Sequence, residues 1–232
     1  MPRLIPALAA LALLSTPVTA QSTTDWANLA RYRDANAALG APRPGEQRVV
    51  FYGNSITDAW ARHFPAMFPG QPYVGRGIGG QTTPQLLVRF RQDVVALRPS
   101  VVVILAGIND IAGNTGPSTL EMIGDNLASM CEVARANGIR VVLSSVLPAA
   151  DFPWRPGLAP APKVIALNAW IRRYAAEQGH VYLDYHAAMA DAQGGMREGL
   201  AYDGVHPTEA GYALMAPLAS RAIAEALAAP LR

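Results

Sequence analysis

Five short apolar runs, separated by segments with helical patterns, constrain the fold of this chain more than any other feature. The runs cover residues 48–52, 73–74, 101–106, 139–146 and 180–183. Nearly continuous apolar runs of this length are typical of strands that are buried on both faces, as in parallel sheets covered by helices. The alternation therefore predicts one α/β domain of three layers, with helices on both faces of a doubly wound, parallel five-stranded sheet.

The segments between the apolar runs carry signals for the beginnings and ends of helices. Ser118 followed by Glu121 has the pattern of a capping box, with Ser118 as the N-cap, and Gly138 ends the apolar periodicity that follows. Further helices are predicted over residues 25–39, 163–178 and 208–228. Each of these helices lies between two predicted strands or flanks the set, as a doubly wound fold requires.

The composition excludes several classes of protein. Of the 232 residues, 51% are hydrophobic and 16% are charged, which predicts a packed core and not a disordered chain. A net charge of +2, without a basic run that includes aromatic residues, argues against nucleic acid as a partner. Cys131 is the single cysteine and lies among apolar residues, so we expect an inert thiol in the core. His63, His180 and His186 have no matching carboxylate spacing, and together with the single cysteine this makes a metal site unexpected.

The first twenty residues have the layout of a secretory signal peptide. Arg3 gives a positive start, residues 4–14 are apolar, and small residues precede Gln21. The apolar stretch is too short for a permanent anchor, and no later segment predicts stable membrane insertion. We therefore expect cleavage after Ala20 and export of a single domain, residues 21–232, to the periplasm or the medium. A buried N-terminal helix is the alternative.

Polar and glycine-rich segments follow the predicted strands directly. They are residues 54–55 after the first strand, 77–80 after the second, 107–110 after the third and the proline-rich 147–162 after the fourth. In doubly wound folds, ligands bind beyond the carboxyl ends of the strands. The candidate site is therefore expected at this edge of the sheet.

Three residues have the chemistry that nucleophilic acyl transfer needs. Ser55 lies at the end of the first strand, where a helix begins, and Asp203 precedes His206 by three residues in a glycine-containing loop. A serine nucleophile, a histidine base and a carboxylate that orients the histidine form a catalytic triad. Pro207 is expected at the first helical position after this loop. The alternatives are that Ser55 only caps a helix and that Asp203 only caps a surface turn.

Acyl transfer also requires donors for the negative charge that develops on the carbonyl oxygen. A glycine in the 77–80 turn can present a backbone N–H at close approach, and Asn109 can present a side-chain amide. A tight turn and a hydrogen-bonded loop asparagine are the simpler interpretations of these two features. The combination with the three residues above favours an oxyanion hole.

In this combination the chain resembles the SGNH hydrolases, also called the GDSL esterase and lipase family. The family is named for serine, glycine, asparagine and histidine in four separated blocks. The similar segments here are residues 53–57, 79–82, 107–110 and 203–207, in the family's order. The resemblance covers about residues 46–228. Four ordered blocks are a specific signal, whereas any one of them alone is weak.

The resemblance implies that Ser55 is the nucleophile, His206 the general base and Asp203 its orienting partner. It also implies an oxyanion hole made of Gly80, Asn109 and the backbone N–H of Ser55. A flavodoxin-like sheet of order 2-1-3-4-5 and the lack of a cofactor are further implications. One departure is Asn54, which stands where the family usually has an aspartate.

Three other hypotheses compete with membership of this family. Residues 75–80 match the glycine fingerprint of dinucleotide-binding proteins, but Asp93, the acidic residue nearest the required spacing, lies in a predicted helix. A non-catalytic carbohydrate-binding module on the same fold is disfavoured by the intact Ser55, Asp203 and His206. An ordinary α/β-hydrolase is disfavoured because the chain has no Gly-x-Ser-x-Gly elbow.

The sequence thus predicts an exported serine carboxylester hydrolase that acts through an acyl-enzyme. Trp154 and Arg155 lie in the loop expected to overhang the site, where Trp154 could stack on a sugar ring and Arg155 could meet an anionic group. A stiff surface loop is the alternative for both. We expect a small-molecule or glycan ester as substrate, with short acyl groups such as acetyl favoured. Lysophospholipase or lipase-like activity and a loosely specific arylesterase remain alternatives, and no oligomeric state is predicted.

Overall fold

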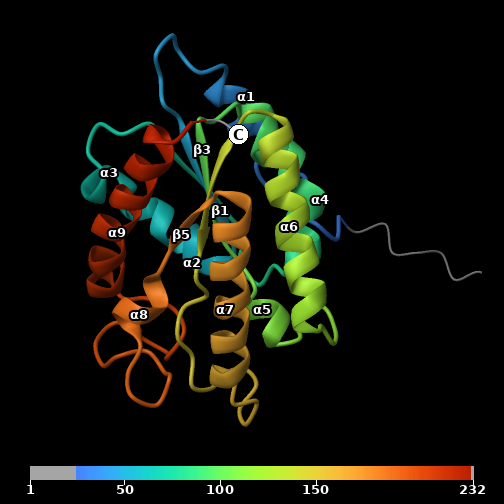
Figure 1. Cartoon of the computed structure of the whole chain (residues 1–232), viewed down its shortest axis with the longest axis vertical. Helices are drawn as coiled ribbons and strands as arrows, with labels where there is room; N and C mark the ends of the chain where they lie inside the picture. The colour runs from blue at the N-terminus through green and yellow to red at the C-terminus, as the bar shows by residue number, and fades with distance from the viewer. Residues whose placement is uncertain (1–24, 231–232) are drawn as a thin grey trace, which may run out of the picture.

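The computed structural model describes residues 25–230 of the chain, and its centre is a parallel sheet. The strands of this part are β1 (Val49–Gly53), β2 (Tyr73–Gly77), β3 (Val101–Leu105), β4 (Arg140–Ser144) and β5 (Val181–Leu183). They pair in the order β2-β1-β3-β4-β5, and every pair is parallel (Figure 1). The predicted fold class and the strand order are therefore confirmed.

Helices cover both faces of the sheet. The described helices are α1 (Arg33–Leu39), α2 (Ser55–Trp60), α3 (Phe64–Met67), α4 (Thr83–Asp93), α5 (Ile108–Ile111), α6 (Leu120–Ala136), α7 (Ala161–Gln178), α8 (Tyr185–Met189) and α9 (Glu209–Ala228), with 3-10 turns at Ala61–His63 and Val95–Leu97. In Figure 1, α4 and α6 lie to the right of the sheet, whereas α3 and α9 lie to the left.

The core has two parts, one on each face of the sheet, because successive side chains of each strand point to opposite faces. Val50 and Tyr52 pack with the apolar side chains of α4, α6 and α7. Val49 and Phe51 pack on the opposite face, with those of α2, α3, α8 and α9. Successive side chains of a strand point to opposite faces, so a strand covered on both sides must be apolar throughout.

The strand register brings the polar segments to one edge. Gly53, the last residue of β1, is level with Gly77 on one side and with Leu105 on the other. When parallel strands end at the same level, the segments that follow them begin next to one another. Ser55, the 78–81 loop and Asn109 are therefore neighbours because of the register.

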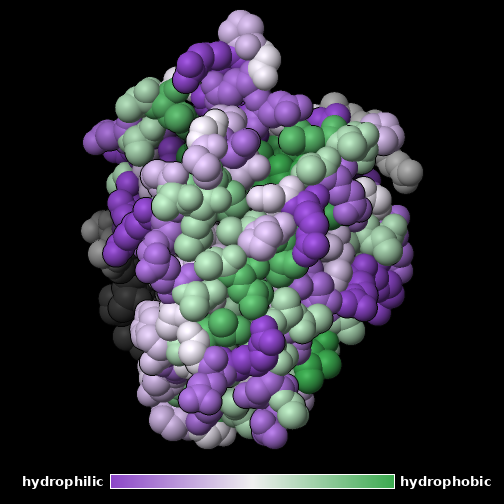
Figure 2. Space-filling view, turned by 90° about the vertical axis from the view of Figure 1, so that its left-hand side faces the viewer, coloured by the Kyte–Doolittle hydropathy of each residue, from purple (hydrophilic) through white to green (hydrophobic). Residues whose placement is uncertain are grey.

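The layer that contains α9 presents shallow apolar grooves to the outside. Figure 2 shows this side of the molecule, where apolar side chains form a band between polar margins. Met67 lines two grooves there, one with Tyr73 and Leu227 and the other with Ala213 and Pro217. Neither lining includes Ser55, Asp203 or His206, so this face is separate from the candidate site.

The predicted leading helix over residues 25–39 is wrong in its first half. Only Arg33–Leu39 is helical, and turns precede it. The carboxylate of Asp25 accepts a hydrogen bond from the N–H of Ala30, and Asn28 has a left-handed backbone with φ of 55°. Asp and Asn stabilise such turns locally, in competition with a helix.

Two predicted helix starts also need correction. The N-cap of α6 is Thr119 and not Ser118, because the hydroxyl of Thr119 accepts the N–H of Met122. Pro207 is not the first helical residue of α9, since Thr208 occupies the N-cap. The capping-box pattern is present elsewhere, between Thr82 and Gln85 at the start of α4.

The predicted signal peptide lies outside the described residues. Within residues 25–230, no helix is both long enough and apolar enough to cross a membrane.

Candidate active site

Ser55 is the first residue of α2, directly after the end of β1. Asn54 is the N-cap, and its side-chain oxygen accepts the N–H of Ile56 at 3.1 Å. Two glycines allow this helix to lie close to the strand ends. A Cβ at Gly53 would lie 2.3 Å from the carbonyl oxygen of Leu105, and one at Gly77 would lie 2.1 Å from the N of Asp58. Close approach of backbones thus fixes the position of Ser55.

The structure brings Ser55, His206 and Asp203 into one line of hydrogen bonds. The Oγ of Ser55 lies 2.9 Å from Nε2 of His206, and Nδ1 of His206 lies 2.7 Å from Oδ2 of Asp203. The side chains of His206 and Asp203 are 19% and 23% exposed, so solvent and a substrate can both reach the imidazole. This is the arrangement in which a histidine can take a proton from a serine.

The second carboxylate oxygen of Asp203 fixes the loop that carries the imidazole. Oδ1 accepts the backbone N–H of Val205 at 2.9 Å and that of His206 at 2.7 Å. Partial burial alone would raise the pKa of Asp203, but these hydrogen bonds and the one from the imidazole outweigh it, so the pKa is lowered.

The charge of Asp203 decides the tautomer of His206. An ionised carboxylate can only accept hydrogen bonds, so Nδ1 carries the proton and donates to Oδ2. In the neutral imidazole, Nε2 is then the acceptor for the hydroxyl of Ser55. The site is therefore set for removal of the serine proton.

Asn109 lies next to the loop after β2. Its side chain is 4% exposed, and its Nδ2 donates to the carbonyl oxygen of Gln81 at 2.9 Å. Because the amide has two N–H groups, one remains for another acceptor. Asp110 ties the same two segments together, since it accepts the N–H of Thr83 at 2.9 Å and the hydroxyl of Thr83 at 2.6 Å.

The two glycines of this loop differ in their surroundings. Gly80 has a φ of 75°, and its carbonyl oxygen accepts Nδ2 of Asn114 at 3.2 Å. No heavy atom lies within 4 Å of a Cβ built on Gly80, whereas one built on Gly79 would lie 3.9 Å from the Cβ of Ser55. The loop thus passes beside Ser55 with backbone and without side chains, which leaves room for a ligand.

Two aromatic side chains lie beside the imidazole of His206. The ring of Trp154 is centred 5.9 Å from it, and that of Tyr202 is centred 5.6 Å from it and nearly parallel. Trp154 is 41% exposed and Tyr202 is 71% exposed. Trp154 was predicted from the sequence and Tyr202 was not, although Tyr202 immediately precedes Asp203.

The guanidinium of Arg155 contacts a neighbouring loop. Its Nη1 donates to the carbonyl oxygen of Ala112 at 2.6 Å, so the guanidinium holds the 151–157 loop against the segment after α5. We therefore describe Arg155 as a tie between two loops. Trp154, the residue before it, is held beside His206 by this tie.

A cavity of about 340 Å³ lies beside Asp203. It lies between the segments 150–156 and 191–196, and its walls include Phe152, Met196 and Gly204. The volume is in the range that small-molecule sites occupy. Its lining includes Asp203 but neither Ser55 nor His206, so the cavity lies on the carboxylate side of the triad.

Comparison with known proteins identifies the family of this chain. Residues 37–214 match the GDSL-like Lipase/Acylhydrolase family. The chain belongs to that family. The family membership and the fold that the four blocks led us to expect are therefore confirmed. Solved structures of similar proteins match most of this chain.

Two Bacteroides structures are similar to this GDSL-like protein over most of their length. One, from Bacteroides fragilis and described as an acylhydrolase, is 46% identical, covers 88% of this chain and 99% of its own, and has a TM-score of 0.85. The other, a GDSL-like lipase from Bacteroides thetaiotaomicron, is 47% identical, covers 86% and 98%, and has a TM-score of 0.83.

More distant similarities concern the fold or a part of the chain. An acetyl-xylooligosaccharide esterase from Geobacillus is 22% identical, covers 76% of this chain and 94% of its own, and has a TM-score of 0.63. A lipoprotein of Bacillus subtilis, YqeF, is 35% identical over 75 residues, so the match spans only 31% of that lipoprotein and 31% of this chain.

Asn54 is the place where this GDSL-like protein departs from the usual family pattern. Its side chain is buried, and its Nδ2 has no hydrogen-bond partner among the described residues. The Oδ1 atom keeps the helix cap that an aspartate would also make. The change therefore preserves the turn and removes a negative charge from the residue before Ser55.

Proposed function

We propose that this protein is a serine carboxylester hydrolase that works through an acyl-enzyme. The observation that carries the proposal is the line of hydrogen bonds from Asp203 through His206 to Ser55, next to the buried amide of Asn109. Membership of an acylhydrolase family supports the same reaction class.

The chemistry follows from the atoms in contact. His206 Nε2 takes the proton of Ser55 as Oγ attacks the ester carbonyl, and Asp203 stabilises the imidazolium that forms. The free N–H of Asn109 and the backbone N–H groups of Gly80 and Ser55 stabilise the negative oxygen of the tetrahedral intermediate. His206 then gives its proton to the leaving alcohol. In the second half, it takes a proton from the water that attacks the acyl-enzyme.

For the substrate, we propose a short acyl group, such as acetyl, on a carbohydrate. Trp154 and Tyr202 expose large aromatic surfaces beside His206, and such surfaces bind the apolar faces of sugar rings. The cavity next to Asp203 has room for the sugar. An acetyl-xylooligosaccharide esterase with the same fold is a precedent for that use of the scaffold.

Hydrolysis of p-nitrophenyl acetate, butyrate and decanoate, beside Ser55→Ala, tests the reaction class. We expect turnover that falls with chain length and is lost in the variant. Turnover that rises towards decanoate would instead favour lipase-like or lysophospholipase use. A lack of turnover above Ser55→Ala on every ester would reject the proposed enzyme and favour a carbohydrate-binding module.

Release of acetate from acetylated xylooligosaccharides tests the substrate class. We expect Trp154→Ala and Tyr202→Ala to raise KM for the oligosaccharide several-fold, because each removes a stacking surface. The same variants should leave KM for p-nitrophenyl acetate nearly unchanged, which serves as the internal control. An equal effect on both substrates would reject a sugar-stacking role.

We also propose that residues 1–20 direct export and that residues 21–232 form the mature domain. The support is the charged start, the short apolar run and the small residues before Gln21. Expression of the full chain in a bacterial host, followed by mass measurement of the protein outside the cytoplasm, tests it. A mature N-terminus at Gln21 is the expected result, and retention of the intact chain in the cytoplasm would reject it.

A further inference from the structure

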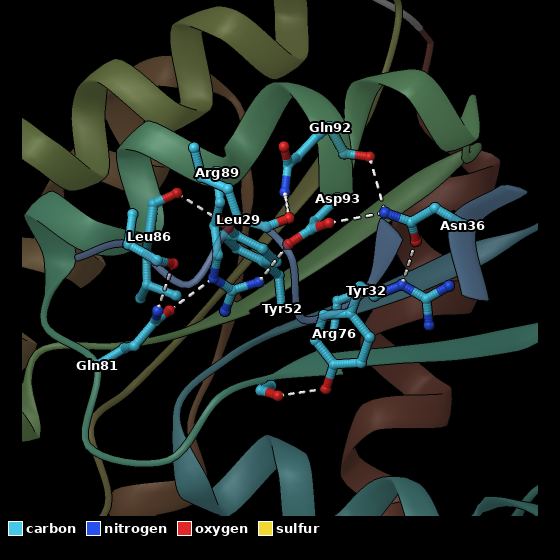
Figure 3. Close-up of polar contacts among 12 residues, drawn as sticks. Leu29, Tyr32, Asn36, Tyr52, Arg76, Gln81, Leu86, Arg89, Gln92 and Asp93 are labelled. Carbon is cyan, nitrogen blue, oxygen red and sulfur yellow. Dashed lines mark hydrogen bonds and ion pairs between the residues drawn. The ribbon is translucent and has the colours of Figure 1, made fainter. Parts of the chain in front are cut away.

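Arg89 lies in α4, behind the candidate site, and its side chain is completely buried. Figure 3 shows its guanidinium between Gln81 and Asp93. Nε donates to Oε1 of Gln81 at 2.6 Å, and Nη1 donates to Oδ2 of Asp93 at 3.0 Å. The guanidinium also lies over the ring of Tyr52, 4.3 Å from its centre. A buried charge with this many partners is held in one geometry.

The third hydrogen bond of Arg89 reaches the segment that carries the nucleophile. Nη2 donates to the carbonyl oxygen of Gly53 at 2.9 Å, and the same oxygen accepts the N–H of Ile78 at 3.1 Å. Gly53 precedes Asn54 and Ser55, and Ile78 begins the loop that contains Gly80. One guanidinium therefore supports the end of β1 and the loop after β2 together.

Gln81 links Arg89 to Asn109 through hydrogen bonds. Its side chain accepts from Arg89, while its backbone carbonyl accepts Nδ2 of Asn109 at 2.9 Å. Gln81 is 3% exposed and Asn109 is 4% exposed, so water does not substitute for these contacts. The position of the Asn109 amide thus depends on where the guanidinium holds Gln81.

The N-terminal segment of residues 25–39, here called the N-terminal strap, contacts the other side of this hydrogen-bond network. Nε2 of Gln81 donates to the carbonyl oxygen of Ala27 at 2.8 Å, and Nε2 of Gln92 donates to that of Leu29 at 2.7 Å. Asn36 donates to the free oxygen of Asp93 at 2.7 Å. The strap therefore covers α4, which keeps Arg89 and Asp93 away from solvent.

We propose that Arg89, acting through Gln81, is a positioning residue for the oxyanion hole. The inference rests on the proposed function, since it concerns the donors of that reaction. Donors to an oxyanion are effective when they are fixed in place before the charge develops. Arg89 meets its three acceptors with three separate nitrogens held in one plane, whereas the three N–H groups of a lysine ammonium share one nitrogen. The substrate touches neither Arg89 nor the strap in this scheme.

The test replaces Gln81, because removal of Arg89 would leave Asp93 buried without its cation and would strongly destabilise the fold. Gln81→Met removes the acceptor for Arg89, and Gln81→Glu keeps it. Gln92→Met is the matched control, because it removes another glutamine that donates to the strap but does not contact Arg89. All are assayed with p-nitrophenyl acetate in the wild-type and Asn109→Ala backgrounds, with thermal unfolding measured for each.

We expect Gln81→Met to lower kcat at least about tenfold with KM within about twofold, because it disturbs an interaction made in the transition state. In the Asn109→Ala background the same change should cost less than about twofold, since two residues acting as one unit are not additive. Gln81→Glu should keep kcat within about threefold, and Gln92→Met should stay near its parent in both backgrounds.

Equal losses from Gln81→Met in both backgrounds would overturn the inference, as would equal kcat values for the Met and Glu variants. Wild-type kcat in Gln81→Met would overturn it as well. If Gln81→Met does not fold, Arg89→Lys takes its place, because it keeps a cation beside Asp93 and loses the fixed fork that holds Gln81. A kcat loss of at least about tenfold that shrinks in the Asn109→Ala background is then expected, and an equal loss in both backgrounds, or no loss, would overturn the inference. Failure of the proposed function is distinguishable, because the wild type itself would then show no turnover above Ser55→Ala.

Discussion

The Oγ of Ser55 and Nε2 of His206 lie 2.9 Å apart although 151 positions separate the two residues in the chain. A second contact between the same two regions supports this approach. The hydroxyl of Tyr212, in the first turns of α9, donates to the carbonyl oxygen of Ile56 at 2.9 Å. Packing of α9 on α2 therefore holds the two parts of the triad together.

Asn109→Ala should lower kcat on the order of a hundredfold, because it removes one donor to the oxyanion. KM for p-nitrophenyl acetate should change little, since the lost interaction belongs to the transition state. Steady-state kinetics on the purified variant measure both values. Kinetics near those of the wild type would reject Asn109 as a donor and would leave the triad untouched.

Asp203→Asn should lower kcat on the order of a thousandfold or more. The side-chain oxygen of the asparagine would continue to accept the N–H groups of Val205 and His206, so its NH₂ group would face Nδ1. Nδ1 would then become an acceptor and Nε2 would carry the proton, which is the wrong tautomer for a base. Kinetics with a far-ultraviolet spectrum as the control for folding test this. Retention of a tenth of wild-type kcat would contradict it.

The lowered pKa of Asp203 predicts a pH dependence of stability. A carboxyl group whose folded-state pKa is below its unfolded value of about 4 stabilises the protein above that pH. The contribution is lost as the pH falls through the lowered pKa. The difference in free energy of unfolding between wild type and Asp203→Asn should thus shrink as the pH falls below about 4. Urea unfolding between about pH 5 and about pH 3 measures it, and a difference that does not shrink over this range would contradict the assignment.

Thr119→Ala should reduce the free energy of unfolding by about 1 kcal/mol, the usual cost of a lost N-cap. Ser118→Ala is the matched control, because Ser118 makes no cap to α6. It should stay within about 0.5 kcal/mol of the wild type. Chemical denaturation of both variants separates the two residues, and a larger loss for Ser118→Ala would reverse the cap assignment.

The strands and the site loops were predictable because their signals are local. Buried parallel strands such as Val101–Leu105 must be apolar on both faces, and Gly138, with φ of 69°, follows the end of α6 as the sequence indicates. Ser55 and Asn109 were selected by residue type at strand ends, and Asp203 and His206 by their spacing in a glycine-containing loop. The strand register brings the first two together, and packing of α9 on α2 brings the last two to Ser55.

The features that the sequence did not reveal depend on tertiary contacts. Arg89 and Asp93 have the spacing of an exposed ion pair on a helix surface, but contacts with β1, Gln81 and the N-terminal strap bury the pair. The N-terminal strap was predicted as one helix. Its first half forms turns instead, which depend on the side chain of Asp25 and the left-handed backbone of Asn28. Tyr202 is visible as a loop residue, but its stacking on His206 requires the fold of the loop.

The most direct measurement of the central claim is covalent labelling of the protein with diethyl p-nitrophenyl phosphate, followed by intact-mass and peptide analysis. The serine oxygen displaces p-nitrophenolate from phosphorus, and the diethylphosphoryl group stays on the nucleophile. We predict one label per chain, located on Ser55, none in Ser55→Ala and much slower labelling in His206→Ala. A label on another residue, or ester turnover that persists in Ser55→Ala, would contradict the account.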